Sequence, residues 1–267
     1  MTTTTPTTST TTPSGRSGEA GRVLALAAAE VRLVARNRTA AVSSVLLPVA
    51  LGVFFAFTFD PGGSAAWATI VALQLVMTIT MGVYMTITQA VVARRQARVL
   101  KRMRTSSLSD GGVLAAVCGP ALTIATLHLV LYAAIDGLLG APLPDPVPLV
   151  VAVLGGTAVG VAAAFATTIV TPSPERAQIT TLPLFFVMFG AAFVLPLVPV
   201  DSPWQALVLV PGAPMGQLTQ LAFSGSTWAP GLLGLPAVLP GLLSLVLWTV
   251  VFATLARRSF RWDPRSL

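Results

Sequence analysis

The sequence predicts an all-α integral membrane protein with six transmembrane helices. We also expect an N-terminal amphipathic helix in the membrane interface and short outer-face helices between the fifth and sixth spans. Composition is the first observation behind this prediction, because 54% of the 267 residues are hydrophobic and only 9% are charged. Soluble domains carry about 25% charged residues, so this chain has too little polar surface to cover a soluble globule. The second observation is that long apolar runs alternate with short polar segments, as membrane spans alternate with loops.

The first 18 residues are rich in Thr, Pro, Ser and Gly and contain no apolar run. This composition predicts a disordered tail and excludes a secretory signal peptide, so residues 19–267 form the transmembrane domain. Residues 19–38 predict an amphipathic helix, with Val23, Ala27, Val31 and Val34 on one stripe and the arginines mostly off it. Such a helix can lie in the membrane interface. The alternative is a short cytoplasmic extension of the first span, but the polar break at residues 37–39 favours a separate helix.

Six apolar runs have about the length that crossing a bilayer requires. They cover residues 41–59, 66–92, 113–139, 149–171, 179–200 and 230–256. Residues 201–229 are less regular, because Pro211, Gly212 and Pro214 interrupt an apolar stretch. We expect short interfacial or re-entrant helices there rather than another span.

The distribution of charge supports this arrangement. With the N-terminus in the cytoplasm, six spans place every Lys and Arg on the inner side, whereas the outer loops carry Asp60, Asp145 and Asp201. An excess of basic residues marks the cytoplasmic face, so both termini are predicted to be cytoplasmic. The net charge of +7 is therefore explained by orientation in the bilayer, and no nucleic-acid partner is predicted.

The segment between the second and third spans, residues 94–110, holds the densest cluster of positive charge. Orientation alone would require a few charges, and a solvated basic loop is the alternative interpretation. However, Val99, Leu100, Met103 and Leu108 would give a short helix one apolar face that a partner could receive. We therefore predict a docking loop for a cytoplasmic partner.

Polar and methionine side chains in the spans indicate a candidate substrate pathway. Its members are Gln74, Thr78, Met81 and Met85 in the second span, with His128 in the third. Uncharged polar groups in a bilayer prefer the bundle interior, and methionines suit varied apolar ligands. The alternative is ordinary helix packing, with the Thr hydroxyls bonded to their own backbone. For Asp136, near the outer end of the third span, and for the small residues Gly156, Gly160 and Ala164, a structural role is favoured.

No catalytic or cofactor site is predicted in this chain. Lys101 is its one lysine and lies outside any GxxxxGK[ST] motif, so the chain has no P-loop for ATP. One histidine, His128, and one cysteine, Cys118, cannot form a zinc site alone. No paired carboxylates lie within the spans.

Residues 95–108, RQARVLKRMRTSSL, resemble the loop pattern of ABC-2 type transporter permeases, Arg-Glu-x-x-(Thr/Val)-Leu-Lys-Arg-Leu-Arg-x-x-Pro-Leu. Gln96 replaces the usual acidic residue and Ser107 the usual proline. Two further stretches are similar to this family. One is residues 175–178 followed by 182–186, at the entry to the fifth span. The other is residues 195–199 followed by Trp204 and residues 211–217, before the sixth span.

This resemblance implies a permease subunit of a drug, antibiotic, lipid or glycan exporter in the bacterial cytoplasmic membrane. Such permeases pair with themselves or with a sister subunit, and they bind separate ATP-binding cassette subunits, which hold the ATP and Mg. The loop would form a coupling helix seated in the ATPase. Its docking residues would be Arg95, Gln96, Val99, Leu100, Lys101, Arg102, Met103, Arg104 and Leu108.

Three other classes of protein remain as alternatives. An ion-coupled secondary transporter would usually need ionisable groups within the membrane, for which only His128 and Asp136 are candidates. An integral membrane enzyme would need a reactive cluster. A membrane anchor or immunity protein would recruit an ATPase without moving a substrate.

Overall fold

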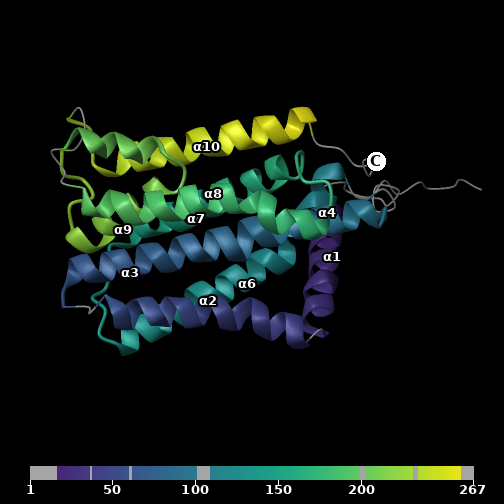
Figure 1. Cartoon of the computed structure of the whole chain (residues 1–267), viewed down its shortest axis with the longest axis horizontal. Helices are drawn as coiled ribbons and strands as arrows, with labels where there is room; N and C mark the ends of the chain where they lie inside the picture. The colour runs from purple at the N-terminus through teal and green to yellow at the C-terminus, as the bar shows by residue number, and fades with distance from the viewer. Residues whose placement is uncertain are drawn as a thin grey trace, which may run out of the picture.

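The computed structural model of the chain describes residues 17–36, 38–59, 62–100, 109–198, 202–230 and 234–259. Its regular elements in these ranges are helices, which confirms the predicted all-α class (Figure 1). In chain order they are α1 (Ser17–Arg36), α2 (Arg38–Thr58), α3 (Ser64–Met77), η1 (Thr78–Met85), α4 (Thr86–Gln96), α6 (Asp110–Leu138), α7 (Pro146–Thr167), α8 (Pro174–Val194), η2 (Leu195–Leu197), η3 (Pro203–Leu209), α9 (Ala213–Ser224) and α10 (Val238–Ser259). The predicted disordered tail lies outside the described residues, except that Ser17 and Gly18 begin α1.

Five helical stretches in the described ranges are long and apolar enough to cross a membrane. They are Ser64–Gln96, Asp110–Leu138, Pro146–Thr167, Pro174–Leu197 and Val238–Ser259. The remaining predicted span corresponds to α2, whose described apolar part, Val45–Thr58, is shorter. The last span begins at Val238 rather than at residue 230, because the chain turns back before it and the backbone N–H of Ala237 bonds the carbonyl of Ala229 at 3.0 Å.

The stretch Ser64–Gln96, made of α3, η1 and α4, is the central helix of the bundle. In its most apolar 18-residue window 78% of the residues are buried, against 22% in Pro174–Leu197 and in Val238–Ser259. Helices η1 and α9 approach α7 closely because glycines of α7 lie at both contacts. A Cβ at Gly160 would lie 2.9 Å from Cγ2 of Ile79 in η1, and one at Gly156 would lie 2.6 Å from Sδ of Met215 in α9. The small residues of this span therefore pack helices within the chain, as expected.

Helix α1 runs across the ends of the spans instead of along them (Figure 1). The predicted stripe faces α6, where a Cβ at Gly119 would lie 2.9 Å from Cβ of Ala27 and one at Gly112 would lie 3.1 Å from Cγ2 of Val23. Glu19 accepts a hydrogen bond from the backbone N–H of Ser109 at 3.2 Å. Hydrogen bonds from the side chain and backbone of Ser109 hold the pKa of Glu19 below its ordinary value.

The irregular region before the last span enters the bundle. η3 and α9 meet at an angle of 114°, and α9 packs against α3, α7, α8 and α10. Met215 and Leu218 of α9 are fully buried. Helix α9 is therefore not a helix lying on the surface of the bundle, and its sharp angle to η3 is that of a re-entrant segment or a broken span.

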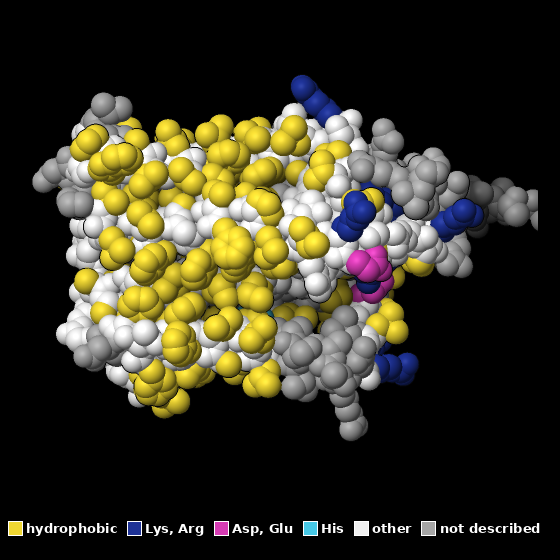
Figure 2. Space-filling view, in the orientation of Figure 1, with side chains coloured by type: hydrophobic (Ala, Val, Ile, Leu, Met, Phe, Trp, Pro, Cys, Tyr) yellow, Lys and Arg dark blue, Asp and Glu magenta, His cyan; other side chains and the backbone are white. Residues whose placement is uncertain are grey.

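The outer surface of the bundle is apolar along the length of the spans (Figure 2). Exposed large side chains occur on α2, α6, α7, α8 and α10, including Phe57, Val130, Leu154, Phe186 and Val250. The described Arg side chains lie near the end of the bundle where α4 stops and α1 crosses, and we call this the basic end (Figures 1 and 2). An apolar band with basic residues collected at one end is the surface expected of a membrane-embedded protein.

Candidate functional site

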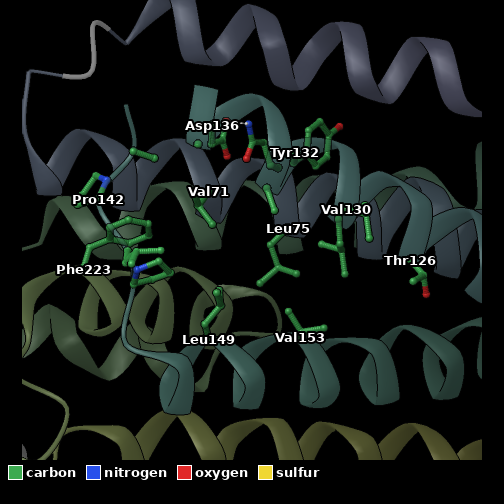
Figure 3. A pocket seen from close by; sticks show the side chains of 17 residues that line it. Val71, Leu75, Thr126, Val130, Tyr132, Asp136, Pro142, Leu149, Val153 and Phe223 are labelled. Carbon is green, nitrogen blue, oxygen red and sulfur yellow. Dashed lines mark hydrogen bonds between the residues drawn. The ribbon is translucent and has the colours of Figure 1, made fainter. Parts of the chain in front are cut away.

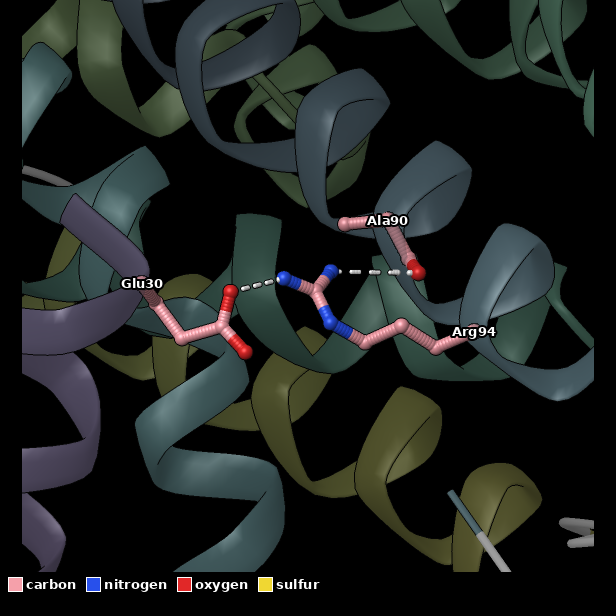
Figure 4. Close-up of polar contacts among 3 residues, drawn as sticks. All are labelled: Glu30, Ala90 and Arg94. Atoms are coloured by element: carbon pink, nitrogen blue, oxygen red, sulfur yellow. Dashed lines mark hydrogen bonds and ion pairs between the residues drawn. The ribbon is translucent and has the colours of Figure 1, made fainter. Parts of the chain in front are cut away.

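An ion pair at the basic end joins two helices that are far apart in the sequence (Figure 4). Nη2 of Arg94, in the last turn of α4, donates to the carboxylate of Glu30 in α1, and Nη1 donates to the carbonyl of Ala90 at 3.3 Å. The Arg94 and Glu30 side chains are 20% and 12% exposed. Partial burial weakens screening by water and salt, so this pair holds α1 to α4 more firmly than a surface pair would.

We expect Glu30→Ala to loosen α1 without unfolding the bundle. The change leaves the half-buried Arg94 without its carboxylate, and α1 should open more readily, by about 1–2 kcal/mol. Hydrogen exchange of the α1 amides in the purified full chain would measure this opening. Glu175→Ala, which removes an exposed carboxylate elsewhere at the basic end, is the control. Unchanged α1 exchange in Glu30→Ala would show that the ion pair does not hold the helix.

Arg95 is buried and binds the C-terminal end of α7. Its side chain is 2% exposed, and its two terminal nitrogens donate to the carbonyls of Thr168 at 3.0 Å and Thr171 at 2.5 Å. The last carbonyls of a helix have no partner within the helix, and a cation beside them also offsets the helix dipole. Arg95 therefore links α4 to α7 inside the chain. The docking role of Arg95 stays a prediction, whereas its two terminal nitrogens donate within its own fold.

The chain leaves α4 after Gln96, one residue beyond Arg95. Ala97 ends the helix, and Arg98 has a φ of 55°, in the left-handed region that terminates helices. Gln96 is exposed and donates to the carbonyl of Pro172 at 3.3 Å. After this turn, Val99 is half-buried and Leu100 is fully buried in the main hydrophobic core.

Leu100 is a predicted docking residue as well, and its side chain packs in the chain's own core, so its contact with a partner stays a prediction. Of the predicted docking residues that the structure describes, only Gln96 and Val99 remain accessible. The other predicted docking residues, Lys101, Arg102, Met103, Arg104 and Leu108, lie outside the described residues.

Gln74, from the candidate substrate pathway, lines a cavity of about 430 Å³ among α3, α6, α7 and α9 (Figure 3). Its side-chain nitrogen donates to Oδ1 of Asp136 at 3.0 Å and to the carbonyl of Gly52 at 3.4 Å. Tyr132 lines the same cavity, and its hydroxyl donates to the carbonyl of Pro48. The cavity thus has an apolar lining and one pair of hydrogen-bonded polar side chains, Gln74 of α3 and Asp136 of α6.

The other members of the predicted pathway do not line this cavity. The hydroxyl of Thr78 donates to the carbonyl of Gln74 at 2.9 Å, which fits the packing alternative. Met81 and Met85 are half-buried on the helix that carries Thr78. His128 is fully buried with its ring centroid 6.3 Å from that of Tyr132, beside Gly82 of η1. The structure therefore separates Gln74 from the rest of the predicted set.

A π-helix occupies the middle of the central span, at Thr78–Met85. The hydroxyl of Thr86 donates to the carbonyl of Met81, five residues earlier, at 2.9 Å. π-Helical turns are rare and frequently occur at functional sites, because they shift the register of one helix face against its neighbours. No residue pattern in the sequence indicated this element.

Sequence reasoning also missed the contacts that join distant segments. It assigned no partner to Glu30 or Asp136, since the pairs with Arg94 and Gln74 span 64 and 62 positions. The available signal was a carboxylate on the predicted amphipathic helix and another within a span. Within the described ranges, no three His, Cys, Asp or Glu side chains are grouped so that they could hold a metal ion.

The chain matches a known protein family. Its description is "ABC-2 family transporter protein", and the match covers residues 59–258. These residues begin at the end of α2 and continue through the last turn of α10. No curated protein and no solved structure gives a significant match to the chain.

Proposed function

Because the chain belongs to the ABC-2 family of transporter proteins, we propose that it is the permease subunit of an ATP-binding cassette exporter. It would move a small hydrophobic molecule, drug or lipid across the membrane, using ATP that a separate subunit binds with Mg and hydrolyses. Family membership implies an ATP-binding cassette partner and a transport role rather than an enzymatic one. It also argues against the ion-coupled carrier and the membrane enzyme, which belong to other classes of protein.

The observation that carries this proposal is that α1 and α7 are both bonded to the end of α4, where the docking loop begins. The loop leaves α4 at Gln96, Arg94 ties α4 to α1, and Arg95 ties α4 to the end of α7. A displacement applied to the loop by a partner would therefore reach α1, α4 and α7 together. Since α4 continues through η1 into α3, that displacement would be transmitted along the central helix of the bundle.

The basic end supports one orientation of the chain in the membrane. The basic end would face the cytoplasm of a bacterial cell, with both chain termini there, because Arg-rich segments stay on the cytoplasmic side of the membrane. The permease would work as a dimer, with itself or with a sister permease. Efflux of drugs or antibiotics, and hence resistance to them, is the corresponding cellular role.

We expect Met103→Asp to abolish association with the ATPase. A carboxylate on the apolar face of the loop would be buried against the partner without a counter-ion, which costs several kcal/mol. The measurement is co-purification of the full chain with a co-expressed cassette ATPase in detergent. Met103→Leu, which keeps the apolar face, is the matched control and should bind as the unchanged chain does.

Leu100 is unsuitable for this experiment, because a charge at a fully buried position would damage the fold itself. Folding of Met103→Asp is checked by labelling of Cys118, the chain's one cysteine, which is buried in α6. Equal ATPase recovery with Met103→Asp and Met103→Leu would place the docking surface elsewhere. No association of the unchanged chain with the ATPase would contradict the proposal.

A further inference from the structure

The cavity among α3, α6, α7 and α9 is built like a small-molecule site with one carboxyl group. Its volume of about 430 Å³ lies within the range of pockets that hold drug-sized ligands. Its wall is mostly apolar and includes valine and leucine side chains of three helices, namely Val71, Leu75, Val130, Leu149 and Val153 (Figure 3). Of its 17 lining residues, Asp136 is the one with a carboxylate, and none is Lys or Arg.

The carboxylate of Asp136 occupies a position that disfavours negative charge. The residue is 5% exposed and lies in the last turn of α6, where the helix dipole is negative. An ionised group within a span is costly and usually marks a functional site. The hydrogen bond from Gln74 requires an acceptor on Oδ1 but no charge, so an asparagine would satisfy it equally.

Two aromatic rings border the same cavity. Tyr132 comes from α6 and Phe223 from α9, and they line the wall together with Asp136 (Figure 3). Aromatic faces attract cations, and the attraction is larger where water is excluded. The described arginines lie at the basic end, away from this cavity, so nothing cationic in its lining offsets the carboxylate.

The cavity opens toward the lipid-facing side of α6. Thr126, Val130, Ala133 and Gly137 line it and are exposed, at spacings that place them along one face of the helix. A molecule already dissolved in the membrane could therefore enter from the side.

We propose that this cavity binds a hydrophobic cation, such as a protonated or quaternary amine or a phosphonium ion with apolar substituents. The apolar wall takes the body of the molecule, and Asp136 with the two rings takes its charge. That such a cation is the exported cargo rests on the proposed function, whereas binding itself needs neither ATP nor a partner subunit.

The test compares two ions of the same shape and opposite charge, tetraphenylphosphonium and tetraphenylborate. Binding to the purified full chain in detergent micelles is measured for each ion and corrected for binding to empty micelles. We expect the cation to bind at least about tenfold more tightly than the anion, a difference of about 1.4 kcal/mol. Asp136→Asn should abolish this preference.

Asp145→Asn is the matched control. Asp145 lies at the same end of the molecule, where it accepts from the backbone N–H of Val147 and the hydroxyl of Thr227, but it does not line the cavity. This variant should retain cation binding. Ala133→Trp fills the cavity from an exposed position and keeps the carboxylate, and it should lose cation binding. If Asp136→Asn exposes Cys118 and is therefore not folded, Ala133→Trp decides the test alone.

Equal binding of both ions would overturn the proposal. Acyl chains or a second copy of the chain would then be the expected occupants of the cavity. Full affinity for the cation in Ala133→Trp, or in a folded Asp136→Asn, would also overturn it. These outcomes leave association with the ATPase untouched, so failure of the cation site and failure of the proposed function are distinguishable.

Discussion

Gly212→Ala is expected to prevent α9 from seating in the bundle and to destabilise the chain by roughly 3 kcal/mol or more. Two causes combine at this position. Gly212 has a φ of +99°, which a residue with a side chain rarely adopts. A Cβ there would also overlap the carbonyl oxygen and Cα of Met188 in α8, and backbone atoms cannot move aside as a flexible side chain does.

Labelling of Cys118 by a maleimide during heating measures this loss, because the thiol is buried in α6 and becomes reactive when the bundle unfolds. Substitutions at two other glycines separate the effect of the positive φ from the effect of the steric overlap. Gly225→Ala, with a φ of +69° and open space around its Cβ, should cost only about 1 kcal/mol. Gly190→Ala, within α8 and also in open space, should leave stability unchanged or slightly higher. If Gly212→Ala unfolds no earlier than Gly190→Ala, α9 does not pack against α8 as described.

Arg95→Met is expected to lower the free energy of unfolding by about 3 kcal/mol. The change removes the charged donors from the carbonyls of Thr168 and Thr171 and leaves these acceptors buried at the end of α7. Methionine has a similar length and keeps most of the apolar contact. The same Cys118 labelling assay measures the effect.

Two controls accompany this prediction. Arg95→Lys should recover only part of the stability, because an ammonium group lacks the planar fork that reaches both carbonyls. Arg257→Met removes an exposed arginine from the last turn of α10 and should change little. A stable Arg95→Met chain that no longer binds the ATPase would place Arg95 on the docking surface and contradict its structural role.

Patterns that act along the chain could be predicted from the sequence. The apolar runs indicated the spans, since bilayer thickness fixes their length. The arginines indicated a single basic end, and the stripe that includes Val23 and Ala27 indicated the apolar face of α1, but not that this face would meet α6. For α9, Pro211 and Pro214 indicated a break, but whether the helix lies on the surface or within the bundle depends on Gly212 and Gly216 meeting α8.

Contacts between distant segments could not be predicted. Arg95 and Leu100 belong to a basic loop with one apolar face, and this pattern alone fits a partner as well as the chain's own core. Only the position of the end of α7 decides that Arg95 binds Thr168 and Thr171. Likewise, Asp136 near the end of a span suggested contact with headgroup water, whereas the approach of Gln74 and the apolar side chains around the cavity bury it.

The central claim is that this chain moves a hydrophobic molecule with energy from a separate ATPase. The most direct measurement is ATP-dependent uptake of a panel of hydrophobic fluorescent probes into inside-out membrane vesicles containing both chains. Vesicles whose ATPase carries a substitution that blocks hydrolysis are the control. We predict accumulation of at least one probe that needs ATP, this chain and an active ATPase. A complex that assembles and hydrolyses ATP but moves no probe would contradict the claim and identify the chain as a membrane anchor.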